Sequence, residues 1–374
     1  MDIGKGRALE LAVSFVSDQW KTLNEDNITV NVFGGGYSDR LFIVEDVSKT
    51  SNSNPTKKFL IRLYGGKLIE KDDIIKAGKC EASEGILFFT NGVKGLGPKL
   101  LGVFDGGRIE EFVPSHQLTE ADLTDKNMSL ELVRKLARFH ALEIPVPKQN
   151  RDLLAISANH QNEYNKDTTL KLAKRIGINE DELMYLDEDY VAEHAFLRSF
   201  ETKVGGRQVL CHGDPNKNNI LVRDKPDQFN ERVMLIDYEL AGTDYRGVDL
   251  AALFLCKMFE MTEDGVFHLV CECPDEEYRH MMLEEYLKET KKLNYFEFDA
   301  IGLDSIDHLM MEVDFFVMYV LQFYKGFFMK MPNSEFFQKL PDEVISSWLR
   351  FIPIMATTYE TQKKCFIEKY SKVI

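Results

Sequence analysis

The sequence predicts an α+β fold of two lobes, with a β-rich N-terminal lobe over residues 1–112 and a mostly α-helical C-terminal lobe over residues 113–374. Three observations lead to this prediction. Short stretches rich in β-branched and aromatic residues, separated by turn-forming residues, fill the first third of the chain. Apolar residues then recur at helical spacing through most of the remainder. The composition changes near residue 113, where we place the lobe boundary.

The N-terminal lobe is expected to begin with an amphipathic helix over residues 1–20. The turn GGGYSD then joins two strands into a hairpin, and a third strand follows a polar loop. Residues 71–92 have the spacing of a helix with an apolar side. Two further strands surround a DGG turn. The expected strands are residues 28–33, 40–45, 59–64, 98–104 and 107–113.

The C-terminal lobe is expected to be helical apart from strands around residues 208–224 and 232–240. These strands are short and apolar, and polar residues follow each of them. The expected helices are residues 129–144, 169–178, 193–204, 249–261 and 276–290, and everything from Asp304 onward.

The bulk composition narrows the class of protein. The 374 residues are 44% hydrophobic and 29% charged, which is typical of a globular chain. The formal net charge of −15 argues against a nucleic-acid partner, because such proteins usually carry a basic face. Six scattered cysteines suggest a reducing compartment, and the Cys271-x-Cys273 pair is a weak metal signal beside the alternative of free thiols. Without a signal peptide or an apolar run long enough to span a membrane, we expect a cytoplasmic protein.

The stretch VLCHGDPNKNNILV carries the strongest chemical signal. Asp214 is followed five positions later by Asn219, which is the spacing of a kinase catalytic loop. In such loops the Asp accepts the proton of the attacking hydroxyl, and the Asn binds Mg²⁺. A second acid is needed at a nearby strand end, and VMLIDYE supplies Asp237, with Glu239 two residues later. Each of these two motifs alone could be a polar turn, but the two in this order predict a catalytic site. The predicted catalytic residues are Asp214, Asn219 and Asp237. The predicted metal ligands are Asn219, Asp237 and Glu239.

Residues of the N-terminal lobe are candidates for binding ATP. Gly34, Gly35 and Gly36 would let backbone N–H groups approach phosphate oxygens, and Ser38 could donate a hydrogen bond, although a tight hairpin turn is an equal alternative. Arg62 lies on the third strand, where kinases carry a phosphate-pairing cation, and the alternative is a solvated edge residue. We expect its acidic partner on the next helix and favour Glu84 over Glu81.

These stretches resemble the choline/ethanolamine kinases, within the protein-kinase-like fold that aminoglycoside phosphotransferases share. The resemblance implies phosphorylation of choline or ethanolamine by Mg²⁺-ATP, the first step of the cytidine-diphosphate route to phospholipids. It also implies adenine binding at Glu111 to Val113, ATP contacts from Arg62, and a tendency to form homodimers. The matching stretches are GGGYSDRLF, FLIRLYGG, GLGPKLLGVFDGGRIEEFVPSHQL, LARFHALEIP, VLCHGDPNKNNILV and VMLIDYELAGTDYRGVDLAALF.

The sequence also departs from the family pattern around the acceptor. Gly213 stands where the family usually has Asn, and Leu240 and Asp244 replace an aromatic residue and an Asn. Cys256 replaces a Glu that helps to bind the amine. The resemblance places Tyr324 and Phe327 where the family has cage tryptophans, with helix core as an equal alternative. The expected substrate pocket is Asp214, Arg246, Cys256, Tyr324 and Phe327.

Three hypotheses for the function follow. The first is a choline/ethanolamine kinase, which the catalytic set and the adenine-binding stretch support. The second is a kinase of the same fold for another amino-alcohol or an aminoglycoside-like substrate, which the departures at Gly213, Leu240 and Cys256 support. The third is a catalytically silent binding protein, which is disfavoured by the retention of Arg62, Asp214, Asn219 and Asp237.

Overall fold

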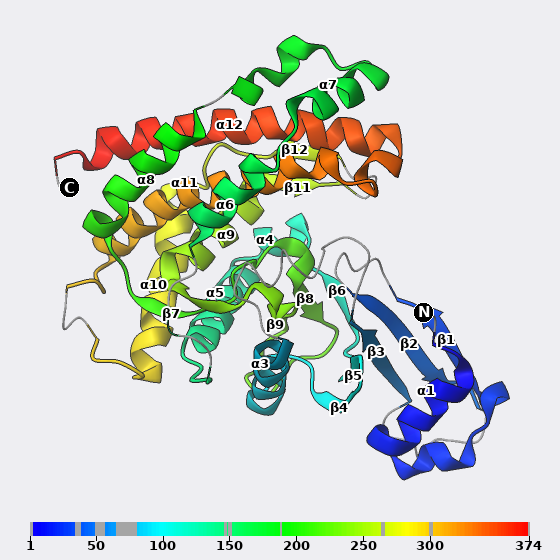
Figure 1. Ribbon diagram of the computed structural model, residues 1–374. Helices are drawn as coiled ribbons and strands as arrows, with labels where there is room; N and C mark the ends of the chain where they lie inside the picture. The colour runs from blue at the N-terminus through cyan, green and yellow to red at the C-terminus, as the bar shows by residue number, and fades with distance from the viewer. Residues whose placement is uncertain are drawn as a thin grey trace. The chain divides into compact units, whose positions relative to one another are not determined.

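The computed structural model describes residues 3–33, 39–48, 57–64, 81–145, 148, 152–187, 189–262, 266–298 and 302–372 (Figure 1). The chain divides into two compact units. Unit 1 comprises Met1–His116 and Val222–Ile236, and unit 2 comprises Gln117–Leu221 and Asp237–Ile374. The expected functional boundary at residues 112/113 stays a prediction, because compactness alone does not show which residues bind a nucleotide.

Unit 1 is built on an antiparallel sheet whose described strands have the order β1-β2-β3-β5-β4 (Figure 1). Alternate residues of β2, including Phe42 and Val44, are buried, so one face of the sheet forms the core. Trp20 lies in this core, with its ring centroid 5.1 Å from that of Phe59. The elements are α1 (Lys5–Leu11), β1 (Ile28–Val32), β2 (Arg40–Asp46), β3 (Lys58–Leu63), α3 (Glu81–Lys94), β4 (Leu100–Phe104) and β5 (Gly107–Glu111).

Unit 2 is mainly helical, and its long apolar helix α11 packs against α6, α9 and α12. Most residues of α11 are buried, which explains why apolar residues occur on nearly every side of this helix. Helix α10 packs against α5. The helices are α4 (Glu120–Thr124), α5 (Lys126–His140), α6 (Leu153–Asn162), α7 (Lys166–Arg175), α8 (Tyr190–Val204), α9 (Arg246–Met258), α10 (Glu276–Leu293), α11 (Ile306–Lys330) and α12 (Asp342–Tyr370).

Short strands complete the described chain. β7 pairs with β10, β11 pairs with β12, and β6, β8 and β9 form a sheet of that order. The pairing of β7 with β10 matters for function, because the turn after β7 contains the predicted catalytic loop. The strands are β6 (Ser115–Gln117), β7 (Gln208–Cys211), β8 (Ile220–Arg223), β9 (Val233–Leu235), β10 (Gly242–Tyr245), β11 (Phe259–Met261) and β12 (Phe267–Leu269).

The sequence predictions agree with most of these elements. The hairpin, the third strand and the last two strands of the N-terminal lobe are confirmed. Helix α6 and strand β10 were not predicted, and the helix expected over residues 249–261 ends at Met258, where β11 begins. The N-terminal helix is also shorter than expected, since α1 ends at Leu11 and is followed by a wider π-helical turn over Ala12–Val16 and a tighter 3-10 turn over Asp18–Thr22.

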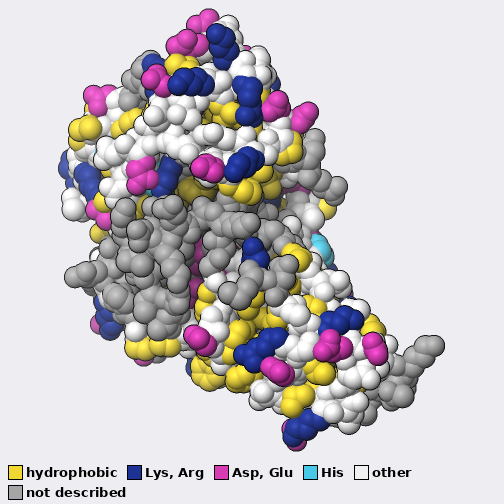
Figure 2. Space-filling model, turned by 45° about the vertical axis from the view of Figure 1, so that its right-hand side comes forward, with side chains coloured by type: hydrophobic (Ala, Val, Ile, Leu, Met, Phe, Trp, Pro, Cys, Tyr) yellow, Lys and Arg dark blue, Asp and Glu magenta, His cyan; other side chains and the backbone are white. Residues whose placement is uncertain are grey.

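Two surface properties bear on the expected partners. Within the described ranges, no helix is both long enough and apolar enough to cross a bilayer. On the face drawn in Figure 2, acidic and basic side chains are interspersed with apolar ones. The net charge of −15 is therefore not gathered into one region of that face.

Candidate active site

The predicted catalytic loop follows directly from the short strand β7. Val209, Leu210 and Cys211 are buried, so this strand is anchored in the core of unit 2. The chain then turns at Gly213, whose φ of +87° lies in the left-handed region. A side chain at this position would be strained, and the turn itself therefore favours glycine. Asp214 is the first residue after the turn.

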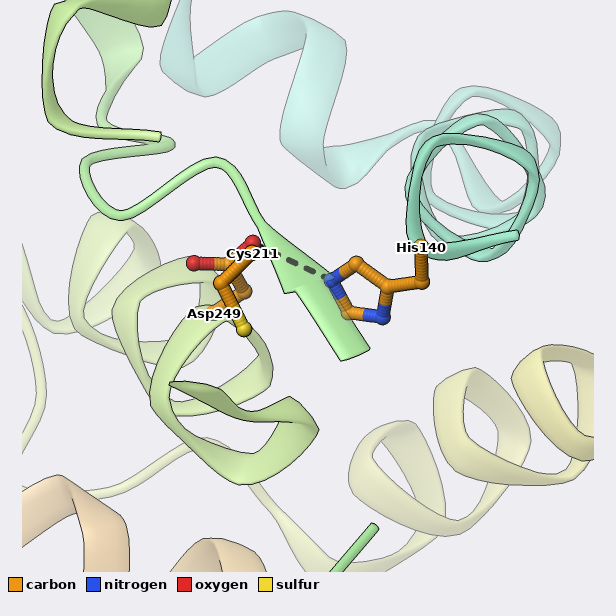
Figure 3. Close-up of side chains that lie close together, drawn as sticks. All are labelled: His140, Cys211 and Asp249. Atoms are coloured by element: carbon orange, nitrogen blue, oxygen red, sulfur yellow. Dashed lines mark hydrogen bonds and ion pairs between the residues drawn. The ribbon is translucent and has the colours of Figure 1, made fainter. Parts of the chain in front are cut away.

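A buried carboxylate holds the backbone of this turn in place. Asp249 of α9 accepts hydrogen bonds from the N–H groups of His212, at 2.6 Å, and Gly213, at 2.8 Å. Its third partner is His140 of α5, whose Nε2 lies 3.1 Å from the same carboxylate (Figure 3). The hydroxyl of Tyr286 lies 2.7 Å from the other ring nitrogen of His140. Two helices are thus tied to the turn that precedes Asp214.

The charge of Asp249 is stabilised in spite of its burial. Burial alone would raise the pKa of this carboxyl, but the hydrogen bond and charge of His140, with smaller contributions from His212 and Gly213, hold the pKa below its usual range. Asp249 therefore stays an ionised acceptor, as the two backbone N–H groups require.

His140, Cys211 and Asp249 offer ligand atoms that all lie within 4.8 Å of one another (Figure 3). Such a group resembles a metal site in composition. Its atoms, however, already have other partners: Asp249 accepts three hydrogen bonds, and Cys211 Sγ lies 3.3 Å from the carbonyl oxygen of Tyr245. We therefore interpret the cluster as the anchor of the loop.

The Asp214 carboxylate is bound by three side chains. Its Oδ1 accepts from the hydroxyl of Tyr324 at 2.8 Å. Its Oδ2 accepts from the amides of Asn216, at 2.8 Å, and Asn219, at 3.1 Å. Burial raises the pKa of Asp214, and the nearby charge of Glu239 adds to this effect, while Asn216 and Tyr324 act in the opposite direction. The structure thus brings Asp214, Asn219 and Tyr324 together.

The second predicted acidic segment lies beside this loop. Tyr238 is buried, and its ring centroid lies 5.6 Å from that of His212 and 5.7 Å from that of Phe139. Asp237, directly before it, has a φ of +62°, an uncommon conformation for a non-glycine residue. The ring contact between Tyr238 and His212 shows that the two segments are close.

The residues of the expected substrate pocket are not all together. Cys256 is buried near Asp214, and its Sγ lies 3.4 Å from the carbonyl oxygen of Pro215. Burial raises the pKa of its thiol to about 12; the charge of Lys217 lowers it and that of Asp214 raises it. The thiol is therefore neutral near pH 7. Phe327 packs instead against His160, at a centroid distance of 6.1 Å.

Arg246 is engaged in a buried ion-pair network at the start of α9. Its Nε donates to Glu312 at 3.0 Å, and its Nη1 donates to Asp304 at 2.8 Å. The guanidinium also donates to the carbonyl oxygen of Leu303 at 2.6 Å. The side chain is 1% exposed. A direct contact with substrate would require breaking these bonds, so the structure favours an anchoring role for Arg246.

In unit 1, Arg62 belongs to a chain of alternating charges. Its Nε donates to Glu110 at 2.7 Å, and Glu110 also accepts from Arg108 at 2.7 Å. Arg108 in turn donates to Glu84 at 2.8 Å. Asp39 lies 3.5 Å from Arg62. Glu84 was expected to pair with Arg62, but the partner that the structure gives it is Arg108, and the link to Arg62 runs through Arg108 and Glu110, two residues that the sequence interpretation missed.

The missed residues could have been found from strand alternation. Arg108 and Glu110 are two positions apart on β5, so their side chains share a face of the sheet. Arg62 and Arg108 are register partners on β3 and β5. Two adjacent arginines require an acid between them, and Glu110 supplies it.

Of the remaining residues predicted to bind the nucleotide, the structure describes only some. Gly34, Gly35, Gly36 and Ser38 lie outside the described residues. The Glu111 carboxylate accepts from the N–H of Lys99 at 3.0 Å, and the carbonyl oxygen of Val113 accepts from the hydroxyl of Ser115 at 2.8 Å.

The fold and the loop together define a phosphotransferase of protein-kinase-like fold. The profile of the family described as choline/ethanolamine kinase matches residues 30–335. A choline/ethanolamine kinase from Rattus norvegicus is 28% identical over 290 residues, covering 76% of this chain and 70% of the relative. The chain therefore belongs to the choline/ethanolamine kinase family, and the resemblance seen in the sequence is confirmed.

Solved structures confirm the expected α+β, two-lobed fold class. The choline kinase from Cryptosporidium parvum Iowa II superposes with a TM-score of 0.68 at 18% identity, covering 98% of this chain and 97% of that chain. The ethanolamine kinase from Plasmodium vivax has a TM-score of 0.57 at 17% identity, covering 96% of this chain and 89% of that chain.

Proposed function

We propose that this protein is an ATP-dependent kinase that phosphorylates the hydroxyl of choline or ethanolamine, the first step of the CDP-choline and CDP-ethanolamine routes to phospholipids. Membership of the family supports the reaction class. The observation that carries the proposal is the carboxylate of Asp214, placed after a rigid turn and bound by Asn219, the expected metal ligand. On the family resemblance, the proposal includes a cytoplasmic enzyme that forms homodimers.

Asp214 acts as the general base in this proposal. The acceptor hydroxyl gives its proton to the carboxylate while its oxygen bonds to the terminal phosphorus of ATP, and the bond from that phosphorus to ADP breaks. Burial raises the pKa of Asp214, which makes its carboxylate a better proton acceptor than an exposed one. The backbone hydrogen bonds to Asp249 keep the loop in place, so positioning does not depend on long, mobile side chains.

The donor set fits magnesium. The Asn219 amide nitrogen is bound to Asp214, which leaves its oxygen as the ligand atom. Asp237 and Glu239 would add carboxylate oxygens, and oxygen donors are those that Mg²⁺ prefers. When bound, the ion neutralises negative charge on the phosphates. Arg62 would pair with phosphate oxygens; the Gly34–Gly36 turn, Ser38, Glu84, Glu111 and Val113 complete the proposed nucleotide-binding set.

A second candidate is a kinase of the same fold for another amino-alcohol. The observation that favours it is the buried neutral thiol of Cys256 beside Asp214, where a carboxylate could attract a cationic amine. A thiol supplies no charge for that attraction, so the acceptor would be selected by shape and by the remaining polar groups.

A direct assay tests the proposal. Purified protein is incubated with Mg²⁺-ATP and, in turn, choline, ethanolamine, methylated ethanolamines and an aminoglycoside. We expect phosphocholine or phosphoethanolamine, with kcat about 10²–10⁴-fold lower for Asp214→Ala. Asp224→Ala removes an exposed carboxylate and serves as the matched control.

The outcomes separate the hypotheses. Turnover confined to another amine would replace the first candidate by the second. ATP binding without any turnover would indicate a silent binding protein and contradict the proposal.

A further inference from the structure

The base of the proposed reaction has a partner from a distant part of the chain. Tyr324 lies on α11, 110 residues after Asp214, and donates its hydroxyl to Oδ1 of Asp214 at 2.8 Å. The tyrosine is partly buried, and its ring lies 5.7 Å from that of Phe323 on the same helix. Because α11 is the central buried helix of unit 2, the phenol is held by a rigid element.

The partners of Asp214 reveal which of its oxygens faces the acceptor. A carboxylate offers about four acceptor positions, two on each oxygen. The amides of Asn216 and Asn219 both bind Oδ2. Tyr324 takes one position on Oδ1. The position that remains for an incoming hydroxyl is therefore on Oδ1, the atom that Tyr324 binds.

We propose that Tyr324 is a positioning residue, whose hydroxyl holds Oδ1 of Asp214 in the orientation in which it receives the acceptor hydroxyl. This inference rests on the proposed function. The two amides fix one oxygen, but the terminal torsion of an Asp side chain is soft, so Oδ1 needs a contact of its own. The Tyr324 hydroxyl supplies that contact from α11, an element far from the loop in the sequence.

The expected effect follows from the geometry of proton transfer. A base displaced by a fraction of an ångström loses much of its catalytic contribution, although the nucleotide and the acceptor still bind. Loss of the Tyr324 hydroxyl should therefore lower kcat and leave the KM for ATP nearly unchanged. A tyrosine that merely fills the core would show no such separation, because phenylalanine fills the same volume.

The experiment compares Tyr324→Phe with Tyr319→Phe. Tyr319 lies on the same helix and is buried among Phe315 and Phe316. We expect Tyr324→Phe to lower kcat by about 10- to 100-fold, with the KM for ATP within about twofold of wild type. Tyr319→Phe should leave kcat within about twofold. A kcat for Tyr324→Phe that is unchanged or higher would overturn the inference.

A double-mutant cycle shows whether Tyr324 acts through Asp214. In the Asp214→Ala background, Tyr324→Phe should change the residual kcat by less than about twofold, because the group it positions is gone. An equal loss in both backgrounds would overturn the inference. The same four proteins are unfolded with denaturant, and a coupling of the two substitutions in unfolding free energy is expected; additive effects would contradict the contact itself.

The result is distinguishable from a failure of the proposed function. If wild-type protein phosphorylates no amino-alcohol, the proposed function fails. The role of Tyr324 is then tested by comparing the slow rate of ATP hydrolysis between wild type and Tyr324→Phe. Water then takes the place of the acceptor hydroxyl at Asp214, so Tyr324→Phe should lower the hydrolysis rate by a similar factor. An unchanged hydrolysis rate would overturn the inference as well.

Discussion

Two buried charge networks, one in each unit, hold the residues that we assign to catalysis. In unit 2, the carboxylate of Asp249 binds backbone N–H groups and the ring of His140. In unit 1, Arg62 belongs to a chain that runs from it through Glu110 and Arg108 to Glu84. The first network holds the main chain of a loop, and the second holds one side chain on a strand.

The two networks therefore control different parts of the protein: one the position of a whole loop, the other the position of a single side chain. A displaced backbone moves every side chain of the loop, whereas a displaced guanidinium changes one contact. The networks also differ in their partners, since Asp249 is bound by two backbone N–H groups and a histidine ring, whereas the unit 1 chain alternates acids and arginines. We therefore expect substitutions in unit 2 to affect kcat most, and those in unit 1 to affect nucleotide binding and stability.

The largest effect is expected for Asp249→Asn. The new amide group would face N–H donors that need an acceptor, so the turn before Asp214 should shift. We expect kcat to fall by at least about 10²-fold and the free energy of unfolding to fall by about 3–5 kcal/mol. Steady-state kinetics and denaturant unfolding measure the two quantities. Asp105→Asn, at an exposed turn, is the control, and equal behaviour of both variants would disprove the role of Asp249.

A smaller effect is expected for Glu110→Gln. The substitution leaves Arg62 and Arg108 buried side by side without the charge between them. The free energy of unfolding should fall by about 2–3 kcal/mol, and the KM for ATP should rise more than kcat falls. Glu45→Gln removes a half-exposed ion pair with Lys58 in the same sheet and should cost less than about 1 kcal/mol. If the two substitutions cost the same, the buried chain is not the source of stability.

The contribution of the ionised Glu110 carboxylate to the free energy of unfolding should depend on pH. Burial would raise the pKa of this carboxyl, but the charges of Arg62 and Arg108 and their hydrogen bonds lower it below the usual 4.5. A group whose pKa is lower in the folded state stabilises the protein fully above its unfolded pKa, and this stability is lost as pH falls through the folded pKa. The difference in unfolding free energy between wild type and Glu110→Gln should therefore shrink from pH 7 to pH 3. A difference that is constant with pH would argue against the ionised pair.

The smallest effect is expected for Tyr286→Phe, at the outer end of the unit 2 network. Its hydroxyl reaches Asp249 only through the His140 ring. Loss of this hydrogen bond should cost about 1–2 kcal/mol of unfolding free energy and reduce kcat by less than about threefold. A loss of kcat as large as that of Asp249→Asn would show that the ring of His140, rather than the carboxylate, controls the loop.

Local patterns in the sequence were enough to predict the strands of the first sheet, most of the longer helices and the catalytic loop, but not short strands such as β10. Asp214, Asn219 and Asp237 could be proposed as catalytic residues from spacing alone, because the proposed base and the proposed metal ligand lie within six residues and a strand end carries the second acid. The N-terminal hairpin was predictable for the same reason, since alternation and turn residues are local signals.

Contacts between segments that are distant in the sequence could not be predicted from local patterns. Tyr324 was expected either in the substrate pocket or in the helix core, and the structure adds a contact that neither alternative included, from its hydroxyl to the Asp214 carboxylate. Arg246 was expected in the pocket, and the structure buries it between Glu312 and Asp304. Both outcomes depend on how α9 and α11 pack, and helical periodicity tells which face is apolar but not what lies opposite it.

The sequence by itself therefore determined the family, the order of the elements in the first sheet and the chemical groups of the catalytic loop, because these are properties of residue types at short spacing. Only the tertiary structure decided which partners those groups have. Asp249 meets the loop from 36 and 37 residues away, and Tyr324 meets it from 110. Residues 212–214 thus carry the proposed base, while the orientation of its carboxylate comes from buried helices that no local pattern connects to it.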